Sequence, residues 1–265
     1  MSEPSASDEG RSDTDVHEAA GQVDAERADV NPILELREVC AAYGPFRSLF
    51  DVTLDVQPGE AVALVGSNGA GKTTLARVAS GLVSPTSGTV KVDGEDMTGA
   101  RIYRFARAGV AHAVEGRSVF ATISVDENLT LGFRRLHGRS GVKADLARAY
   151  ELFPQLGQRR NQLAGTLSGG EQRMLSLARV MVEVPKILIA DELSLGLAPI
   201  IVDELYESLG RLRDEGTALL IIEQQIGHAL ALADRVGFLE HGSISWLGPR
   251  AEADAIVQMA YDPTG

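Results

Sequence analysis

Short apolar runs alternate with longer helical patterns along the chain from residue 33 onward. The runs 33–39 and 48–56 interleave apolar and polar residues, a pattern that is typical of half-buried antiparallel strands. Four other runs are apolar throughout, which indicates strands that are buried on both faces of a parallel sheet. These runs cover residues 61–65, 187–190, 218–222 and 236–239.

Helical periodicity fills most of the sequence between these runs. In the segment 199–213, for example, Val202, Leu205 and Leu209 fall on one stripe. The predicted helices cover residues 72–82, 126–136, 143–152, 169–182 and 199–213. Since strands and helices alternate, the sequence predicts an α/β fold. The region from about 98 to 166 is more helical than the rest, so we expect a helical subdomain inserted between two strands of the sheet.

The first residues of the chain have a different composition. Residues 1–31 hold nine acidic side chains against two arginines, and this stretch therefore supplies about −7 of the net charge of −12. It contains no aromatic residue and only isolated valines, so it cannot bury enough apolar surface to offset the entropy of ordering. We expect residues 1–32 to be a disordered acidic tail and residues 33–265 to form one domain. An acidic arm that docks on a partner is the alternative.

Composition and charge exclude several classes of protein. No apolar run approaches the roughly 18 residues of a membrane-spanning helix, and the first ten residues are acidic and polar, unlike a secretory signal. The net charge of −12 disfavours a general nucleic-acid binder, whose affinity would come from Lys and Arg on phosphates. The single cysteine, Cys40, cannot form an intramolecular disulfide. We therefore expect a protein of the cytoplasm that binds no nucleic acid.

A glycine-rich loop lies between the predicted strand 61–65 and the predicted helix that begins at residue 72. Residues 66–73 match the pattern G-x-x-x-x-G-K-[ST] in the strand–loop–helix context that this motif requires. The glycines let backbone N–H groups cradle phosphate oxygens, Lys72 reaches the terminal phosphates, and Thr73 offers a hydroxyl to Mg²⁺. The predicted nucleotide-binding residues of this segment are Gly66, Ser67, Asn68, Gly69, Ala70, Gly71, Lys72, Thr73 and Thr74.

Two adjacent carboxylates, Asp191 and Glu192, follow the apolar run 187–190. The carboxyl ends of strands in an open α/β sheet face the crevice where ligands bind. We expect Asp191 to hold the Mg²⁺ shell and Glu192 to orient or deprotonate a water for attack on the γ-phosphate. Lys72 and Glu192 are thus the predicted catalytic residues of a nucleotide hydrolase.

The sequence Leu-Ser-Gly-Gly-Glu-Gln at residues 167–172 resembles the signature of ATP-binding cassette (ABC) ATPases. The resemblance implies a P-loop NTPase core of the ABC type, with an antiparallel β subdomain and an inserted helical subdomain. In that family Ser168, Gly169 and Gly170 would close over the γ-phosphate of ATP held by a partner subunit. With one phosphate loop in this chain, a second chain must supply the other half. Arg173 follows the motif. We expect it to be a surface arginine, and a contact with phosphate or a partner is the alternative.

Four further positions carry expectations from this family. Tyr43 matches the aromatic residue that stacks on adenine. Glu115 stands where most cassettes have a γ-phosphate-sensing glutamine that also contacts Mg²⁺, and Gln224 stands where most have a catalytic switch histidine. Leu193 replaces the proline that usually follows the catalytic glutamate, which leaves that turn less restricted. The resemblance therefore implies Glu115 as a metal ligand and Gln224 as a catalytic residue.

Several segments together look like the shorter of the two ATPase subunits of branched-chain amino-acid importers. They are E-G-R at 115–117, V-x-E-N-L at 125–129, E-L-F-P at 151–154, D-E-x-S-L-G-L-A-P-I at 191–200 and E-Q at 223–224. This resemblance implies ATP and Mg²⁺ as ligands and ATP hydrolysis coupled to transport. It also implies a paralogous second ATP-binding subunit, transmembrane permease subunits, an extracytoplasmic solute-binding protein as an indirect partner, and a place on the cytoplasmic face of the membrane.

Other functions stay open at the level of sequence. Urea and short-chain amide importers have closely related ATPases, and these motifs separate them poorly from amino-acid importers. A non-transport cassette protein is a second class, although such proteins usually carry two cassettes or a long coiled-coil insertion. A module that binds ATP without hydrolysing it is a third, which Glu115, Leu193 and Gln224 favour and Glu192 opposes.

Overall fold

The structure is a computed structural model that describes residues 31–113, 119–224 and 226–253. Contacts between Cα atoms divide the chain into Met1–Asn31 and Pro32–Gly265, and the fold below belongs to the second unit. The acidic tail predicted for residues 1–32 lies almost wholly outside the described residues. Within the described ranges, no helix combines the length and the apolar character that crossing a membrane requires.

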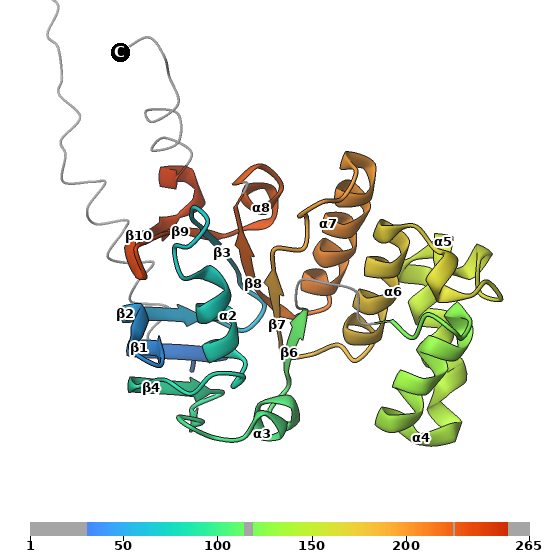
Figure 1. Ribbon diagram of the computed structural model, residues 1–265, viewed down its shortest axis with the longest axis horizontal. Coiled ribbons are helices and arrows are strands. Elements are labelled where there is room, and N and C mark those ends of the chain that lie inside the picture. Colours follow the sequence, from blue (N-terminus) through green and yellow to red (C-terminus); the bar gives the residue numbers. More distant parts are fainter. Residues whose placement is uncertain (1–30, 114–118, 225, 254–265) are drawn as a thin grey trace, which may run out of the picture. The chain divides into compact units, whose positions relative to one another are not determined.

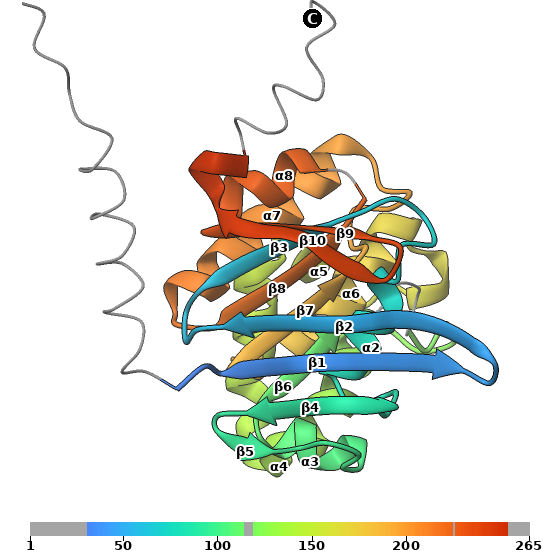
Figure 2. The same cartoon turned by 90° about the vertical axis from the view of Figure 1, so that its left-hand side faces the viewer.

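An antiparallel sheet forms one layer of this unit (Figure 2). Its strands are β1 (Leu34–Tyr43), β2 (Phe46–Val56), β4 (Ser87–Val92) and β5 (Glu95–Asp96), in the order β2-β1-β4-β5. The two long strands β1 and β2 are joined by a tight turn, and Tyr43 pairs with Phe46 at its ends. The antiparallel strands predicted near residues 33–39 and 48–56 are therefore confirmed.

A six-stranded sheet with the order β10-β9-β3-β8-β7-β6 forms the centre of the unit. The five strands from β9 to β6 are parallel, and β10 is antiparallel to β9. Every residue of β3, β7 and β8 is buried, as the continuous apolar runs predicted. The strands are β3 (Ala61–Val65), β6 (Val110–Ala113), β7 (Ile187–Asp191), β8 (Ala218–Glu223), β9 (Arg235–Glu240) and β10 (Ser243–Pro249).

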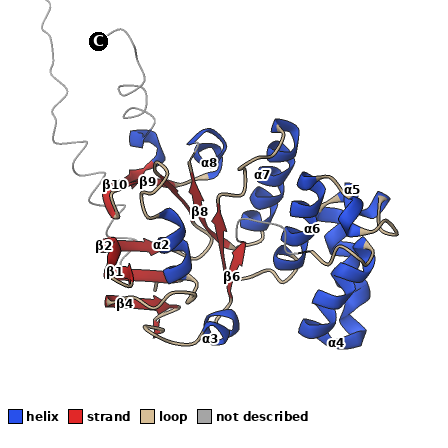
Figure 3. Cartoon of the chain, viewed as in Figure 1, coloured by secondary structure: helices blue, strands red, loops and turns tan. Residues whose placement is uncertain are grey.

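Helices cover both faces of the central sheet (Figures 1 and 3). Helix α2 lies on the side of the antiparallel sheet, and helices α4 to α7 lie on the other side. The helices are α2 (Lys72–Ala79), α3 (Ile102–Arg107), α4 (Val125–Leu152), α5 (Pro154–Gln158), α6 (Gly169–Met181), α7 (Pro199–Asp214) and α8 (Ile226–Leu232), with a 3₁₀ turn, η1 (Ala164–Thr166). This layering of sheet, helix, sheet and helices agrees with the predicted α/β class.

The alternation of side chains along β3 separates two apolar cores. Val62 and Leu64 pack with the antiparallel sheet and with Leu75 of α2. Ala61 and Ala63 point to the opposite face and join the core formed with helices α4 to α8. The phosphate loop, which follows β3 directly, is thus anchored between two packed layers.

The structure corrects two details of the predicted helical region. Residues 126–136 and 143–152 belong to one helix, α4, because the intervening segment contains no proline and its glycines weaken a helix by only about 1 kcal/mol each. The region from about 98 to 166 also includes β6, which pairs with β7 and so belongs to the central sheet. Among the described residues, the helical insertion therefore begins after β6.

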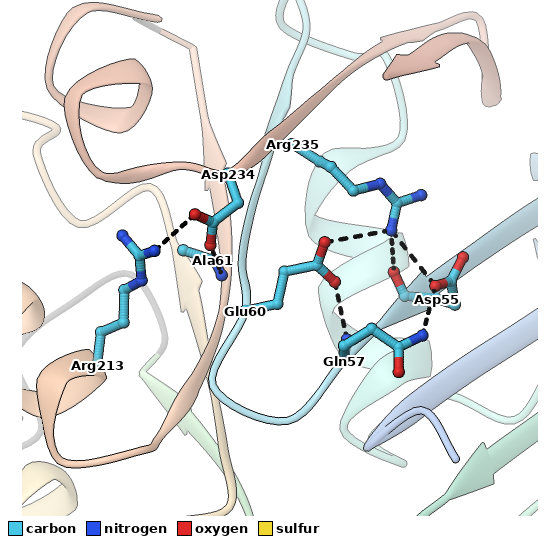
Figure 4. A network of polar contacts seen from close by, with 7 residues as sticks. All are labelled: Asp55, Gln57, Glu60, Ala61, Arg213, Asp234 and Arg235. Atoms are coloured by element: carbon cyan, nitrogen blue, oxygen red, sulfur yellow. Dashed lines mark hydrogen bonds and ion pairs between the residues drawn. The ribbon is translucent and has the colours of Figure 1, made fainter. Parts of the chain in front are cut away.

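A polar network lies at the amino ends of β3 and β9, away from the phosphate loop (Figure 4). The guanidinium of Arg235 lies 3.3 Å from Asp55 Oδ2 and 3.6 Å from Glu60 Oε1. Next to it, Asp234 Oδ2 accepts a hydrogen bond of 2.9 Å from the backbone N–H of Ala61. This network joins the antiparallel sheet to the start of β3, and it provides a buried glutamate that is remote from the candidate site.

Candidate functional site

Two glycines shape the loop between β3 and α2. Gly69 has a φ of +82° and Gly71 a φ of +103°, conformations that residues with a side chain rarely adopt. A Cβ atom on Gly71 would also lie 2.8 Å from the carbonyl oxygen of Ser48. Glycine is therefore required at residue 71 both by the backbone conformation and by the close approach of β2. The loop holds its shape at the start of α2, where backbone N–H groups are available to an anion.

Lys72 is the first residue of α2, and its side chain is only 3% exposed. Its ammonium donates hydrogen bonds to the carbonyl oxygens of Gly66 at 2.9 Å and Ser67 at 3.0 Å. Its third contact is Glu192 Oε1 at 3.0 Å. The phosphate loop therefore holds the lysine within reach of the predicted catalytic carboxylate, and the ion pair joins two segments that lie 120 residues apart in the sequence.

A cavity of about 270 Å³ lies between the loop and Glu192. Thr74 lies at its wall, where its hydroxyl forms a hydrogen bond of 2.8 Å with the hydroxyl of Ser48 on β2. The lining residues are Ser48, Asn68, Gly69, Gly71, Lys72, Thr73, Thr74 and Glu192. Predicted phosphate-binding residues and the predicted base thus share one cavity.

The turn after β7 carries the two acidic residues. Asp191 ends the strand and is 2% exposed. Glu192 has a φ of +48°, a left-handed conformation that costs energy in a residue other than glycine. Its backbone N–H donates to the carbonyl of Ile222 at 2.9 Å, and its own carbonyl accepts from Arg173 Nη2 at 2.5 Å. Leu193 stands where most of the family have proline, and its side chain is buried in the core. Packing of this side chain therefore restrains the turn, as the ring of a proline would.

The donor atoms near the loop suit magnesium. Thr73 lines the cavity and supplies a hydroxyl oxygen, whereas Asp191, at the buried end of β7, supplies a carboxylate but is not among the lining residues. Mg²⁺ prefers such oxygen ligands, usually one or two from the protein with phosphate and water completing its shell. No cluster of three or more His, Cys, Asp or Glu side chains that could hold a metal occurs in the described ranges. Glu115, the third predicted metal ligand, lies outside the described residues.

The predicted signature residues stand at the start of another helix. Ser168 caps α6, since its hydroxyl accepts from the backbone N–H of Glu171 at 3.3 Å while the Glu171 carboxylate accepts from the Ser168 N–H at 2.8 Å. Gly169 and Gly170 form the first turn of α6. None of these three predicted residues lines the cavity at the phosphate loop, so the structure does not bring them together within the chain.

Tyr43 and Gln224 lie at the margins of the site. Tyr43 ends β1 and is 44% exposed, with its hydroxyl 3.5 Å from Arg77 Nη1 on α2. Gln224 follows β8 and lines a second cavity, of about 210 Å³, which also touches Glu192. Tyr43 does not line the cavity at the phosphate loop, but an exposed aromatic ring against α2 and an exposed amide beside Glu192 are compatible with the roles predicted for these residues.

Two residues near Glu192 differ from the expectations or were missed. Arg173 is buried and contacts the Glu192 carbonyl, so the prediction of a surface arginine was wrong. Glu223 is the last residue of β8, is 2% exposed, and binds Ser194 in the loop after Glu192. The resemblance at 223–224 and the charged end of an otherwise apolar strand both pointed to Glu223, but neither indicated its contact with Ser194.

A half-buried histidine, His112, lies on β6 beside the end of α2. Burial, and after it the positive charge of Arg77, lowers the pKa of His112 to about 4. Its Nδ1 lies 2.9 Å from the hydroxyl of Ser80, which follows α2. The imidazole is therefore neutral near pH 7 and adds no positive charge to the nucleotide cavity.

The chain was compared with known proteins. Residues 49–194 match the ABC transporter family. The high-affinity branched-chain amino acid transport ATP-binding protein BraG of Pseudomonas aeruginosa is 41% identical over 212 residues, which cover 80% of this chain and 91% of that protein. A probable branched-chain amino acid transport ATP-binding protein, LivF, of Archaeoglobus fulgidus is 32% identical over 213 residues, covering 80% and 90%.

The fold is also similar to solved structures. The ADP conformation of an ATP-binding cassette of an ABC transporter aligns with a TM-score of 0.75 over 88% of this chain and 96% of that one, at 23% identity. At this level of identity the likeness concerns the fold. It agrees with the P-loop core, antiparallel subdomain and helical insertion described above.

Proposed function

Because the chain belongs to the ABC transporter family of ATP-binding subunits, which bind and hydrolyse ATP, we propose that it powers an importer for branched-chain amino acids. The observation that carries this proposal is the 41% identity with a branched-chain amino acid transport ATP-binding protein over 91% of that protein's length. The motifs at residues 115–117, 191–200 and 223–224 support it, since they are similar to the same subfamily.

The site residues take the following roles in the proposal. The triphosphate lies in the cavity at the phosphate loop, with Lys72 on the terminal phosphates and Tyr43 stacked on the adenine. Glu192 accepts a proton from a water molecule as the water oxygen attacks the γ-phosphorus atom. The bond to the bridging oxygen breaks, and ADP leaves with that oxygen. Gln224 hydrogen-bonds the γ-phosphate without itself gaining a proton near neutral pH.

The ion pair between Lys72 and Glu192 implies that ATP binds before Glu192 acts as a base. The ammonium has three N–H groups, and they point to Gly66, Ser67 and Glu192. A γ-phosphate that takes one of these N–H groups competes with the Glu192 carboxylate. ATP binding therefore weakens the hold of Lys72 on Glu192 and frees the carboxylate to take a proton from water.

Thr73 and Asp191 would hold Mg²⁺, with Glu115 as a further ligand in the proposal. When bound, the ion supplies positive charge to the phosphate oxygens. Gly71 and the first turn of α2 hold Thr73 toward the cavity, and the buried end of β7 fixes Asp191. The protein thus contributes rigid positioning from two neighbouring elements of the core.

The proposed assembly contains more than this chain. Ser168, Gly169 and Gly170 do not line the chain's own cavity, which supports a role toward ATP held by a second ATP-binding subunit, and we propose a paralogue for that subunit. Transmembrane permease subunits then hold both cassettes at the cytoplasmic face of the membrane, and an extracytoplasmic binding protein delivers the solute.

Deleting the gene for this chain is expected to abolish high-affinity uptake of labelled leucine and to leave urea uptake unchanged. The reason is that the permease cannot cycle without its ATPase subunit. Uptake of both labelled solutes is measured in the deletion strain, with and without the gene restored on a plasmid. Loss of urea uptake alone would move the protein to the urea or amide importers, and wild-type uptake of both would overturn the importer proposal.

A further inference from the structure

We infer that Glu223 is a positioning residue for hydrolysis, which fixes the loop of residues 193–198 and thereby the direction of the Glu192 carboxylate. We call these residues the post-catalytic loop. Glu223 does not line the cavity at the phosphate loop. The inference rests on the proposed role of Glu192 as the base.

Three hydrogen-bond donors converge on the Glu223 carboxylate. The backbone N–H of Ser194 donates to Oε1 at 3.0 Å, and the Ser194 hydroxyl donates to Oε2 at 2.8 Å. The hydroxyl of Tyr206, on α7, donates to Oε1 at 3.3 Å. The Glu223 side chain therefore accepts hydrogen bonds from both the main chain and the side chain of Ser194.

The chemistry of this contact requires a carboxylate or a close substitute. An ionised carboxylate offers only acceptors, and the donors that reach it from the described residues are neutral. Burying such a group costs free energy unless hydrogen bonds compensate it. Burial, and after it the negative charge of Glu223, raises the pKa of Tyr206, so the phenol stays protonated as a donor.

The backbone of Glu223 connects the same residue to the phosphate loop. Glu223 pairs with Val65 at the end of β3, and its carbonyl accepts from the N–H of Gly66 at 3.4 Å. The preceding residue, Ile222, accepts from the N–H of Glu192. The end of β8 is thus the element that both the phosphate loop and the turn of Glu192 use as a common support.

Packing alone does not hold the post-catalytic loop. A cavity of about 210 Å³ lies against it, lined among others by Glu192, Ser194, Glu223 and Gln224. Leu195 is exposed, and Gly196 has a φ of +72°. Beyond the buried Leu193, where side chains do not fill the space, the hydrogen bonds of Ser194 to Glu223 add a second restraint on the chain that follows Glu192.

This restraint matters for the reaction because Glu192 already has a left-handed backbone conformation. Ser194, two residues later, holds the backbone in place through its hydrogen bonds to Glu223. The Glu192 carboxylate therefore keeps its direction toward Lys72 and the cavity. A displacement of about 1 Å at a reacting group can cost on the order of 100-fold in rate. Gln224 follows Glu223 directly, so the same anchor also places the predicted switch residue.

The test measures steady-state ATP hydrolysis and ATP affinity of the purified full chain and its variants. Glu223→Ala is expected to lower kcat by about 10- to 100-fold with KM and the Kd for ATP changed less than about twofold. Glu223→Gln keeps one acceptor for Ser194 and is expected to recover most of the lost kcat. In the Glu223→Ala background, Ser194→Ala is expected to cause no further loss of kcat, because both substitutions remove the same hydrogen bond between the Ser194 hydroxyl and Glu223.

A matched control separates positioning from stability. Glu60 is also a buried glutamate, at the other end of β3 in the network of Figure 4. Glu60→Ala is expected to lower the Tm while the folded protein keeps its kcat. If Glu223→Ala yields no folded protein, Ser194→Ala takes its place, with a fall in kcat at unchanged KM expected.

Four results would overturn the inference. The first is an unchanged kcat in Glu223→Ala, or in Ser194→Ala where that variant replaces it, and the second is a loss that appears in KM instead of kcat. The third is a double variant in which the losses of the two single variants multiply. The fourth is a Glu223→Gln variant that is as impaired as Glu223→Ala. Glu192→Gln is measured in parallel. Full activity in Glu192→Gln would remove the proposed base whatever the Glu223 variants do, so the two proposals fail separately.

Discussion

Glu192→Gln is expected to reduce ATP hydrolysis by roughly 100- to 10,000-fold, the usual contribution of a general base. An amide has the same shape as the carboxylate but cannot take the proton of the attacking water. The substitution also removes the ion pair of 3.0 Å with Lys72, which leaves the ammonium free for phosphate. ATP binding is therefore expected to be unchanged or tighter, and the measurement compares kcat with the Kd for ATP.

The control for this substitution makes the same chemical change elsewhere. Glu95, on β5, is exposed and pairs with Arg104 at the surface, remote in sequence from either catalytic segment. Glu95→Gln is expected to hydrolyse ATP at the wild-type rate. A wild-type rate in Glu192→Gln would remove Glu192 from the role of base and would favour a cassette that uses another group.

Lys72→Met is expected to weaken ATP binding by roughly 10- to 150-fold, as the loss of a charged hydrogen-bond donor worth about 1.5 to 3 kcal/mol implies. Methionine keeps a similar apolar stem but has no ammonium for phosphate. The change also leaves the carbonyls of Gly66 and Ser67 without this donor, so the loop loses part of its support. Hydrolysis is expected to fall further than binding, because the developing charge on the γ-phosphate is no longer stabilised.

Titration calorimetry of ATP binding and the steady-state rate check this prediction together. Lys186→Met is the matched control, since Lys186 is exposed and pairs with Asp93 on the surface. Such exposed pairs contribute little, and the control is expected to bind and hydrolyse ATP normally. An unchanged Kd in Lys72→Met would mean that the triphosphate does not lie in the cavity at this loop.

The parts of the site that were predicted from sequence are those specified by local chemistry. The short apolar run 61–65 favours a buried strand, and the glycines after it allow an unusual backbone, so the phosphate loop was identified with its surroundings. Asp191 and Glu192 were identified in the same way, as the polar end of a buried strand. The structure then placed Glu192 beside Lys72, which sequence spacing alone does not specify.

The parts that sequence reasoning missed depend on contacts between distant segments. Arg173 was expected to be a surface arginine, but α6 packs so that its guanidinium reaches the Glu192 carbonyl. Glu223 meets Ser194 only because β8 lies beside β7 in the sheet. Helix packing sets the first contact and strand order the second, and local periodicity predicts neither. The single helix α4 was predicted as two shorter helices.

The most direct measurement of the central claim is uptake of labelled leucine by cells whose only copy of this chain carries Glu192→Gln. Cells with the wild-type chain and cells with Glu95→Gln serve as references, and immunoblotting confirms equal amounts of protein. We predict that leucine uptake is lost in the Glu192→Gln cells and normal in both references. Leucine uptake at the wild-type rate in the Glu192→Gln cells would contradict a role for ATP hydrolysis by this chain in branched-chain amino-acid import.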